Sequence, residues 1–264
     1  MTNDASSHPD RAPATAPSAS STPSTPPTLP AGSTYEAEAP LPGGATMALA
    51  CIPATAGEPS DGLRGWVESD PDARGTLAVW MSFQGTHVHW STGRCAIAAP
   101  VDRIAAVRTA ILEATAHERA LRSVEEAMAS AWPALESDAA LAFEFDEASV
   151  GRRRELRERL HRTLVLRARL ARIAPYLLAP LAHPPTLASQ VAERLRERLR
   201  MPTRHEAAAT QLEVFRDAYD MCGQRASEFM LARTGHRLEW VIIVLLATQL
   251  LLWGFEYLAV ATGG

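Results

Sequence analysis

The sequence predicts an α+β protein: a small N-terminal β-containing region, then a helical hairpin or bundle, then one C-terminal transmembrane helix. Three observations support this prediction. Apolar residues alternate in short runs within residues 47–100, and they recur three and four positions apart within residues 101–237. Residues 238–261 are almost wholly apolar, as expected of a segment that spans a bilayer.

Residues 1–46 are rich in Pro, Ser, Thr, Ala and Gly, and Arg11 is their only basic residue. Such a composition cannot bury enough apolar surface to offset the entropy of the chain, so we predict a disordered tail. This tail does not resemble a secretory signal peptide, because no basic stretch is followed by an apolar run.

The region 47–100 is predicted to be β-rich. Runs at 76–81 and 86–91 flank Gln84 and Gly85, and apolar residues alternate in both runs. This pattern is typical of a β-hairpin with its turn at Gln84–Gly85.

Residues 101–237 are predicted to be helical. One amphipathic helix, or two, is expected between Ile104 and about residue 133, where Pro133 should end it. A basic helix is expected over 152–176, with Leu156, Leu160 and Leu164 on one stripe, and a third helix over 186–200.

A seam with coiled-coil spacing follows in the next segment. Its residues are Leu212, Phe215, Tyr219, Cys222, Ala226 and Phe229. The seam covers only about two and a half heptads, which is short for an independent coiled coil. We therefore expect the seam to pack against the 152–176 or 186–200 helix. Self-association through the seam stays open as the alternative.

The segment 240–261 has the length and composition of a membrane span. As a helix its 22 residues would cover about 33 Å, against roughly 30 Å of hydrocarbon. Twelve of them are Leu, Ile, Val or Phe, which favours insertion by something on the order of 5 kcal/mol. Gln249 and Glu256 are its two strongly polar residues. The alternative is a buried helix of a soluble core.

With three residues after it, this span would be a tail anchor. Arg225, Arg233 and Arg237 precede it, so the positive-inside rule places the bulk of the chain in the cytoplasm, at the cell (inner) membrane. An amide in lipid tends to find a hydrogen-bond partner, so we expect Gln249 to help the span self-associate into a homo-oligomer.

Composition excludes several kinds of chemistry. The chain has no lysine, so all 26 basic residues are arginine, and chemistry that needs a lysine amine is ruled out. Cys51, Cys95 and Cys222 are an odd number of widely spaced cysteines, which argues against a disulfide framework. Charge is unevenly distributed: residues 1–150 carry a net −11, residues 152–200 a net +9, and residues 201–264 a net −2.

The basic block lies on the two helices within 152–200. Its first helix carries Arg152, Arg153, Arg154, Arg157, Arg159, Arg162, Arg167, Arg169 and Arg172. Its second carries Arg194, Arg196, Arg198 and Arg200. We favour a solvated face paired with acidic residues of the same chain, while contact with anionic lipid headgroups stays open. Nucleic acid is a third possibility and is not favoured, because aromatic residues for base stacking are not interleaved.

No residue is assigned a catalytic, cofactor-binding or metal-binding role, and no small-molecule substrate is evident. His87 and His89 would share one face of a strand and could hold a metal with Cys51 or Cys95, but no close cysteine pair supports this. No serine has the setting of a nucleophile elbow. A membrane-bound metal enzyme is therefore the least favoured alternative.

The start of the apolar segment carries a family resemblance. Arg237, Leu238, Glu239 and Trp240, followed by Val241, Ile242, Ile243 and Val244, resemble the ending of the required-for-meiotic-nuclear-division family, whose domain is of the YagE type and of unknown function. Looser likenesses lie at Phe83, Gly85, Val88 and Trp90, and at 164–170 and 206–237. The resemblance covers about residues 47–258.

The resemblance implies a mixed N-terminal region, a helical region and a membrane-associated structural or tethering role without enzymatic activity. Mitochondrial relatives are linked to supporting translation from the inner membrane, which implies a ribosome- or RNA-binding tether as an alternative. The chain departs from the family in a shorter stretch at 131–152, and in Gln249 where an acidic residue is expected.

Overall fold

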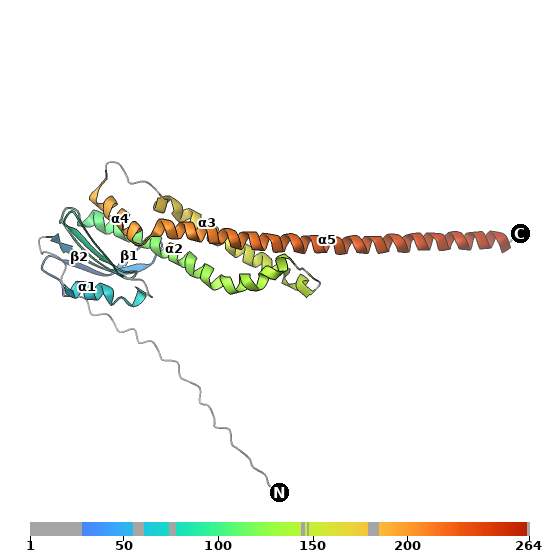
Figure 1. The fold of residues 1–264 in the computed structure, drawn as a ribbon, viewed down its shortest axis with the longest axis horizontal. Coiled ribbons are helices and arrows are strands. Elements are labelled where there is room, and N and C mark those ends of the chain that lie inside the picture. The colour runs from blue at the N-terminus through green and yellow to red at the C-terminus, as the bar shows by residue number, and fades with distance from the viewer. Residues whose placement is uncertain are drawn as a thin grey trace, which may run out of the picture.

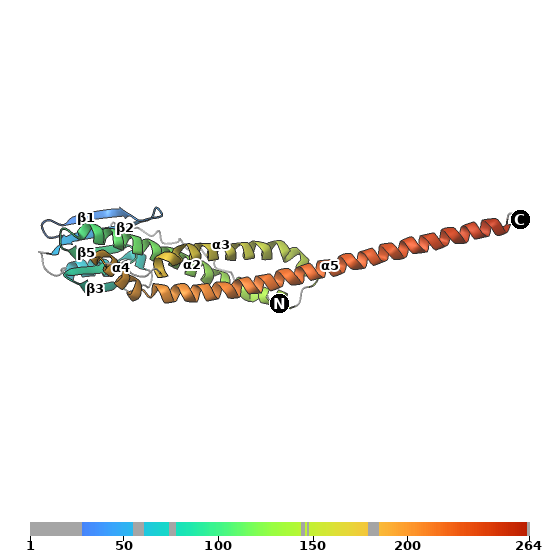
Figure 2. The same ribbon diagram turned by 90° about the horizontal axis from the view of Figure 1, so that it is seen from above.

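The computed structural model describes residues 28–54, 61–73, 78–143, 146, 148–178 and 185–262. It confirms the α+β fold class: a five-stranded sheet is followed by helices, the last of which is long and apolar at its C-terminal end (Figure 1). The sheet lies at one end of the molecule, and the far end of the last helix projects from the other (Figure 2).

The sheet has the order β1-β2-β5-β4-β3. Its strands are β1 (Thr34–Pro40), β2 (Thr46–Pro53), β3 (Val79–Phe83), β4 (Thr86–Trp90) and β5 (Arg94–Ala99). Strands β2 and β5 pair in parallel, and the other neighbours are antiparallel. The predicted hairpin is confirmed as β3–β4, with Gln84 and Gly85 both at positive φ, as a tight two-residue turn requires.

Both faces of the sheet are covered, which explains why every residue of the central strand β5 is buried. Helix α1 (Asp61–Glu68) covers one face through Leu63, Trp66 and Val67. The long helix α2 (Ile104–Asp138) covers the other face, where Trp90 of β4 donates a hydrogen bond from its indole nitrogen to the Thr115 hydroxyl at 2.8 Å.

The predicted boundary of the N-terminal tail is wrong at its C-terminal end. Residues 1–27 lie outside the described part of the chain, but Thr34–Pro40 form strand β1. This strand pairs with β2, and its Glu36 accepts two hydrogen bonds from the Arg108 guanidinium of α2. The strand lies at the edge of the sheet and has few large apolar side chains. Its position depends on β2 and Arg108, and the composition of the strand itself does not indicate these partners.

The predicted end of the first long helix near Pro133 is also wrong. Helix α2 continues through Pro133 to Asp138 as one helix. An interior proline costs about 3 kcal/mol, and the residues beyond it offset that cost by packing. Leu135 joins an apolar cluster, and the buried Asp138 carboxylate pairs with Arg152 and Arg159.

The remaining helices form a bundle with α2. They are α3 (Arg153–Leu178), α4 (Leu187–Arg198) and α5 (Met201–Thr262), and short 3-10 turns occur at Pro71–Ala73, Ala139–Ala142 and Ala148–Arg152. The basic helix predicted at 152–176 is confirmed as α3, and the helix predicted at 186–200 is confirmed as α4. Thr186 caps α4 by accepting a hydrogen bond from the Ser189 amide.

The predicted seam packs within the chain. Phe215, Tyr219 and Cys222 of α5 are buried in one cluster with Leu156 and Leu160 of α3. The prediction of packing against the 152–176 helix is therefore confirmed. The buried part of this seam is therefore covered by the chain's own helices.

The boundary predicted at residue 238 does not coincide with any break in structure. Helix α5 is continuous over 62 residues, so the bundle segment and the apolar segment are one rod. The rod begins beside the sheet and leaves the bundle before its C-terminal end (Figures 1 and 2).

Candidate functional site

The C-terminal part of α5 is the most unusual surface of the molecule. Every described side chain from Leu238 to Gly254 is exposed, and Leu250 and Trp253 are 72% and 70% exposed. Helix α5 is long and apolar enough to cross a membrane, and none of its most apolar 18-residue window is buried. A soluble core helix with this composition would be covered, so the alternative of a buried core helix is not what the structure shows.

The residues of the membrane-entry motif lie at the start of this apolar surface. Leu238 and Trp240 are each more than half exposed, and the Glu239 carboxylate lies 3.2 Å from Nδ1 of His236. Gln249 is exposed within the apolar stretch. Arg237 and Glu256 lie in α5, but their side chains fall outside the described part of the structure.

A length of largely exposed helix separates the last buried residue of α5 from the apolar surface, and Phe229, Met230 and Arg233 are half-buried along it. Ala226 is the last buried residue of α5 among the described side chains. Residues 227–239, here named the stalk, follow it, and the rise from Ala226 to Trp240 is about 21 Å. The stalk carries Leu231, which is 73% exposed, and its Glu228 pairs with Arg225 at 2.9 Å.

Part of the basic block is paired with acidic residues of the chain, as the favoured interpretation predicted. The buried Asp138 carboxylate at the end of α2 binds the guanidinium groups of both Arg152 and Arg159. Arg154 pairs with Glu158 at 3.1 Å on the solvent side of α3.

The other arginines of the block divide into paired and unpaired groups. Arg167 of α3 reaches Glu213 at 3.8 Å, and Arg196 of α4 pairs with Glu193. Arg194 stacks on the Phe83 ring at 4.1 Å. The α3 arginines that make no ion pair with a described residue are Arg153, Arg157, Arg162, Arg169 and Arg172.

The position of α3 limits which of its arginines could reach a bilayer crossed by α5. Leu156 packs beside Cys222, and the Leu170 carbonyl lies 3.3 Å from the His205 ring, so α3 runs antiparallel to α5. The arginines from Arg157 onward therefore lie beside the part of α5 that precedes Ala226. With α5 upright, the stalk holds them farther from the headgroups than the Debye length of about 8 Å. In that placement these arginines do not reach the headgroups.

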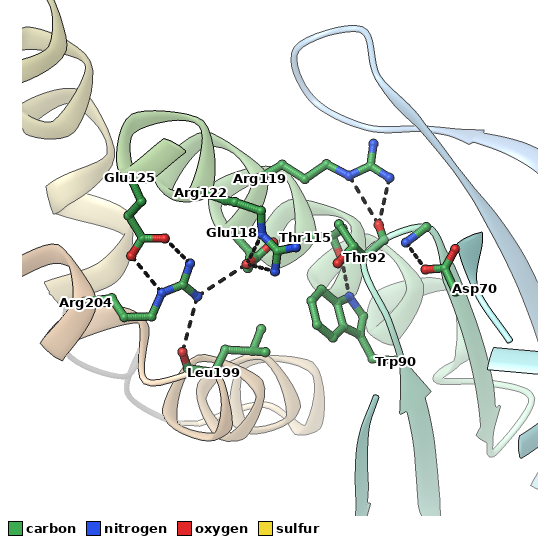
Figure 3. Close-up of polar contacts among 11 residues, drawn as sticks. Asp70, Trp90, Thr92, Thr115, Glu118, Arg119, Arg122, Glu125, Leu199 and Arg204 are labelled. Atoms are coloured by element: carbon green, nitrogen blue, oxygen red, sulfur yellow. Dashed lines mark hydrogen bonds and ion pairs between the residues drawn. The ribbon is translucent and has the colours of Figure 1, made fainter. Parts of the chain in front are cut away.

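A buried polar network joins the start of α5 to the middle of α2 (Figure 3). The Glu118 side chain is fully buried, and its Oε1 accepts hydrogen bonds from Arg122 at 2.8 Å and from Arg204 at 3.3 Å. Arg204 also makes a bidentate contact with Glu125 at 2.9 and 2.5 Å and donates to the Leu199 carbonyl. One guanidinium thus connects α2, the end of α4 and the first turn of α5.

The sequence predictions missed this network. Glu118 lies in the apolar stripe of α2, between the buried residues Ile111 and Thr115 on one side and Leu121 on the other. An acidic residue in a stripe of otherwise core positions is the signal that could have indicated a buried ion pair.

A second polar cluster fixes the loop between β4 and β5 (Figure 3). The Asp70 carboxylate accepts hydrogen bonds from the Ser91 hydroxyl at 2.7 Å and the Gly93 amide at 2.6 Å. A Cβ at Gly93 would lie 2.7 Å from the same carboxylate, so a larger residue there would have to displace Asp70 from its hydrogen bonds. Arg119 of α2 donates to the Thr92 carbonyl of this loop. These contacts hold the loop to α1 and α2.

The three cysteines are buried, and His117 is half-buried. Burial raises the pKa of the thiols of Cys51, Cys95 and Cys222, which disfavours their thiolate forms. Burial also lowers the pKa of His117, although the nearby Glu113 opposes this, and its ring stacks on Tyr176 at 4.4 Å between centroids.

His87 and His89 lie two apart on β4, as predicted, and Nδ1 of His87 is buried without a hydrogen-bond partner. Among the described residues, no group of three potential metal ligands comes together.

No protein-family model matches this chain, and no curated protein or solved structure is detectably similar to it. The resemblance to the required-for-meiotic-nuclear-division family therefore stays a prediction that depends chiefly on residues 237–244.

Proposed function

We propose that this protein is a single-span membrane protein and a non-enzymatic scaffold or tether. In this proposal α5 crosses the bilayer over about residues 240–261, and the stalk holds the α+β body on the cytoplasmic side of the inner membrane. The observation that carries the proposal is the exposed apolar surface from Leu238 to Trp253, which surrounds α5 on all sides. A helix satisfies its own backbone hydrogen bonds, so lipid can solvate the backbone of such a helix without leaving peptide groups unpaired.

The ends of the apolar segment support this placement. Trp240 lies at its start, and Trp253 lies in its second half, where amphipathic aromatic rings favour the membrane interface. Arg225 and Arg233 precede the segment, which supports a cytoplasmic body under the positive-inside rule. The polar pair of His236 and Glu239 would lie at headgroup depth.

A structural role agrees with the family resemblance and with the form of the molecule. The stalk joins the span to the body as one continuous helix, so the distance between them is fixed by the length of that helix. A body held about 21 Å from its anchor by a helix is suited to presenting a surface to a partner at a defined height.

Alkaline carbonate extraction tests the membrane assignment. The full chain is expected to stay in the membrane pellet, and a chain that ends at Glu239 is expected to move to the supernatant. Circular dichroism of the shortened chain confirms that its body still folds. Release of the full chain by carbonate would refute the assignment, because a peripheral protein is stripped under these conditions whereas a spanning helix is not.

We further propose that the span self-associates with the help of Gln249. In lipid an interhelical hydrogen bond contributes about 0.6 kcal/mol on average and up to about 1.7. Gln249→Leu is therefore expected to weaken the dimer roughly three- to twentyfold, measured by energy transfer between labelled chains in bilayers. Thr248→Val is the matched control, because the Thr248 hydroxyl already donates to the Val244 carbonyl of its own helix at 2.7 Å. Equal association of both variants would contradict the proposal.

A further inference from the structure

The bundle of α2, α3 and α5 contains a cavity of about 440 Å³. It exists because small side chains meet where larger ones would close the bundle. Helix α2 contributes Ala127, Ala131 and Ala134, and α3 contributes the buried Thr163 at the facing position. The volume lies within the range of about 300–1,000 Å³ that is usual for sites of small organic ligands.

The inner wall of this cavity is apolar. Leu212 and Phe215 of α5 and Met128 of α2 line it, and all three belong to the buried core. The Thr163 hydroxyl is already engaged with the Arg159 carbonyl of its own helix at 3.1 Å. The apolar part of this wall therefore suits an alkyl chain.

The outer wall is cationic. Arg159, Arg162 and Arg169 of α3 all line the cavity. Arg159 is occupied by Asp138 and Glu155, whereas Arg162 and Arg169 are exposed and make no ion pair with a described residue. They lie seven residues apart, so they share one side of α3 at a separation of about 10 Å along its axis.

We propose that this cavity binds one long-chain fatty acid. The alkyl chain would lie between α2 and α5, against Leu212 and Phe215, and the carboxylate would lie at the mouth beside Arg162 or Arg169. Guanidinium groups bind carboxylates by charge-assisted hydrogen bonds, so the free cations at the mouth select an anionic head. A cavity of this size holds a single chain, which disfavours a two-chain phospholipid.

Photolabelling of the full chain in phosphatidylcholine nanodiscs tests the proposal. The probe is palmitate with a diazirine near its methyl end, and labelled positions are identified by peptide mass spectrometry. Labels are expected on the cavity segments of α2, α3 and α5 in addition to the exposed end of α5. The cavity belongs to the body, so the same labelling can be carried out in buffer if the protein does not insert into membranes.

Substitutions at the mouth of the cavity distinguish specific binding of the fatty acid from unspecific partition of the probe into the bundle. Arg162→Gln/Arg169→Gln is expected to reduce labelling of the cavity by about tenfold, since each lost charged hydrogen bond weakens the bound head while solvent moderates the loss. Arg157→Gln/Arg172→Gln removes the same charge from α3 outside the cavity and should leave labelling unchanged.

Filling the cavity gives an independent measurement. Thr163→Leu is expected to abolish labelling of the cavity while labelling of the exposed end of α5 persists. Ala131→Leu fills the same space from α2 and serves if the first variant does not fold.

Competition identifies the head group. Excess palmitate should suppress labelling of the cavity, and hexadecanol should not. Labels confined to the exposed end of α5, or equal competition by hexadecanol, would overturn the proposal. Stronger competition by lysophosphatidate than by palmitate would assign the mouth to a lipid phosphate and would overturn the choice of a fatty acid.

Discussion

Arg204→Met is expected to lower the free energy of unfolding of the body by about 3 kcal/mol, because it removes one of the two guanidinium partners of the buried Glu118 carboxylate, and a buried charge that loses a partner is costly. Glu118 is fully buried, and Arg122 alone would then neutralise it. The same substitution removes the bidentate contact with Glu125 and the hydrogen bond to Leu199, which together hold the first turn of α5. Urea unfolding of the full chain in mild detergent, followed by near-ultraviolet circular dichroism, measures the change.

Two further variants identify the cause. Replacing Glu118 by Met in the same chain should recover part of the loss, because no buried carboxylate is then left with too few partners, whereas the contacts of Arg204 with Glu125 and Leu199 stay lost. Arg216→Met removes another α5 arginine whose pairing with Asp217 is solvent-exposed, and it should cost less than about 1 kcal/mol. If Arg204→Met/Glu118→Met were as unstable as Arg204→Met alone, the loss of stability would not come from the Glu118 carboxylate.

Leu246→Arg/Leu250→Arg is expected to abolish stable membrane integration. Each substitution raises the free energy of membrane insertion by roughly 3 kcal/mol at a central position of the span. The two together outweigh the favourable contribution of about 5 kcal/mol from the aliphatic and Phe residues of the span. The fraction of protein that resists carbonate extraction should fall from nearly all to a small minority.

The same double substitution outside the span is the matched control. Met221 and Leu231 are also exposed on α5, and they lie before the apolar segment. Met221→Arg/Leu231→Arg should therefore leave the carbonate-resistant fraction unchanged. Retention of the Leu246→Arg/Leu250→Arg chain in the pellet would mean that something other than lipid solvates the end of α5.

Much of the helical half of the fold could be predicted from spacing alone. The α5 seam has regular steps of three and four residues, and its face is indeed buried against α3. The β3–β4 hairpin was also evident, because Gln84 and Gly85 separate two alternating runs. Such features depend on residues a few positions apart, which the sequence displays directly.

The rest of the sheet was harder to predict. Strand β5 has small residues on both faces and no alternation, because α1 and α2 cover it from both sides. Strand β1 is predominantly polar or small and is held by β2 and by Arg108, which lies 72 residues from Glu36. Partners so distant in the chain leave no local pattern.

The sequence by itself determined that residues 240–261 have the length and composition of an apolar, membrane-spanning helix and that a basic helical block precedes them. Both are properties of composition and local period, which do not depend on what the segment touches. Only the tertiary structure decided which arginines are paired, that Glu118 and Arg204 meet in the core, and that a cavity opens beside Arg162 and Arg169. The physical reason is that charge pairing and packing depend on distances in space between residues far apart in the chain, which the order of residues along one segment does not specify.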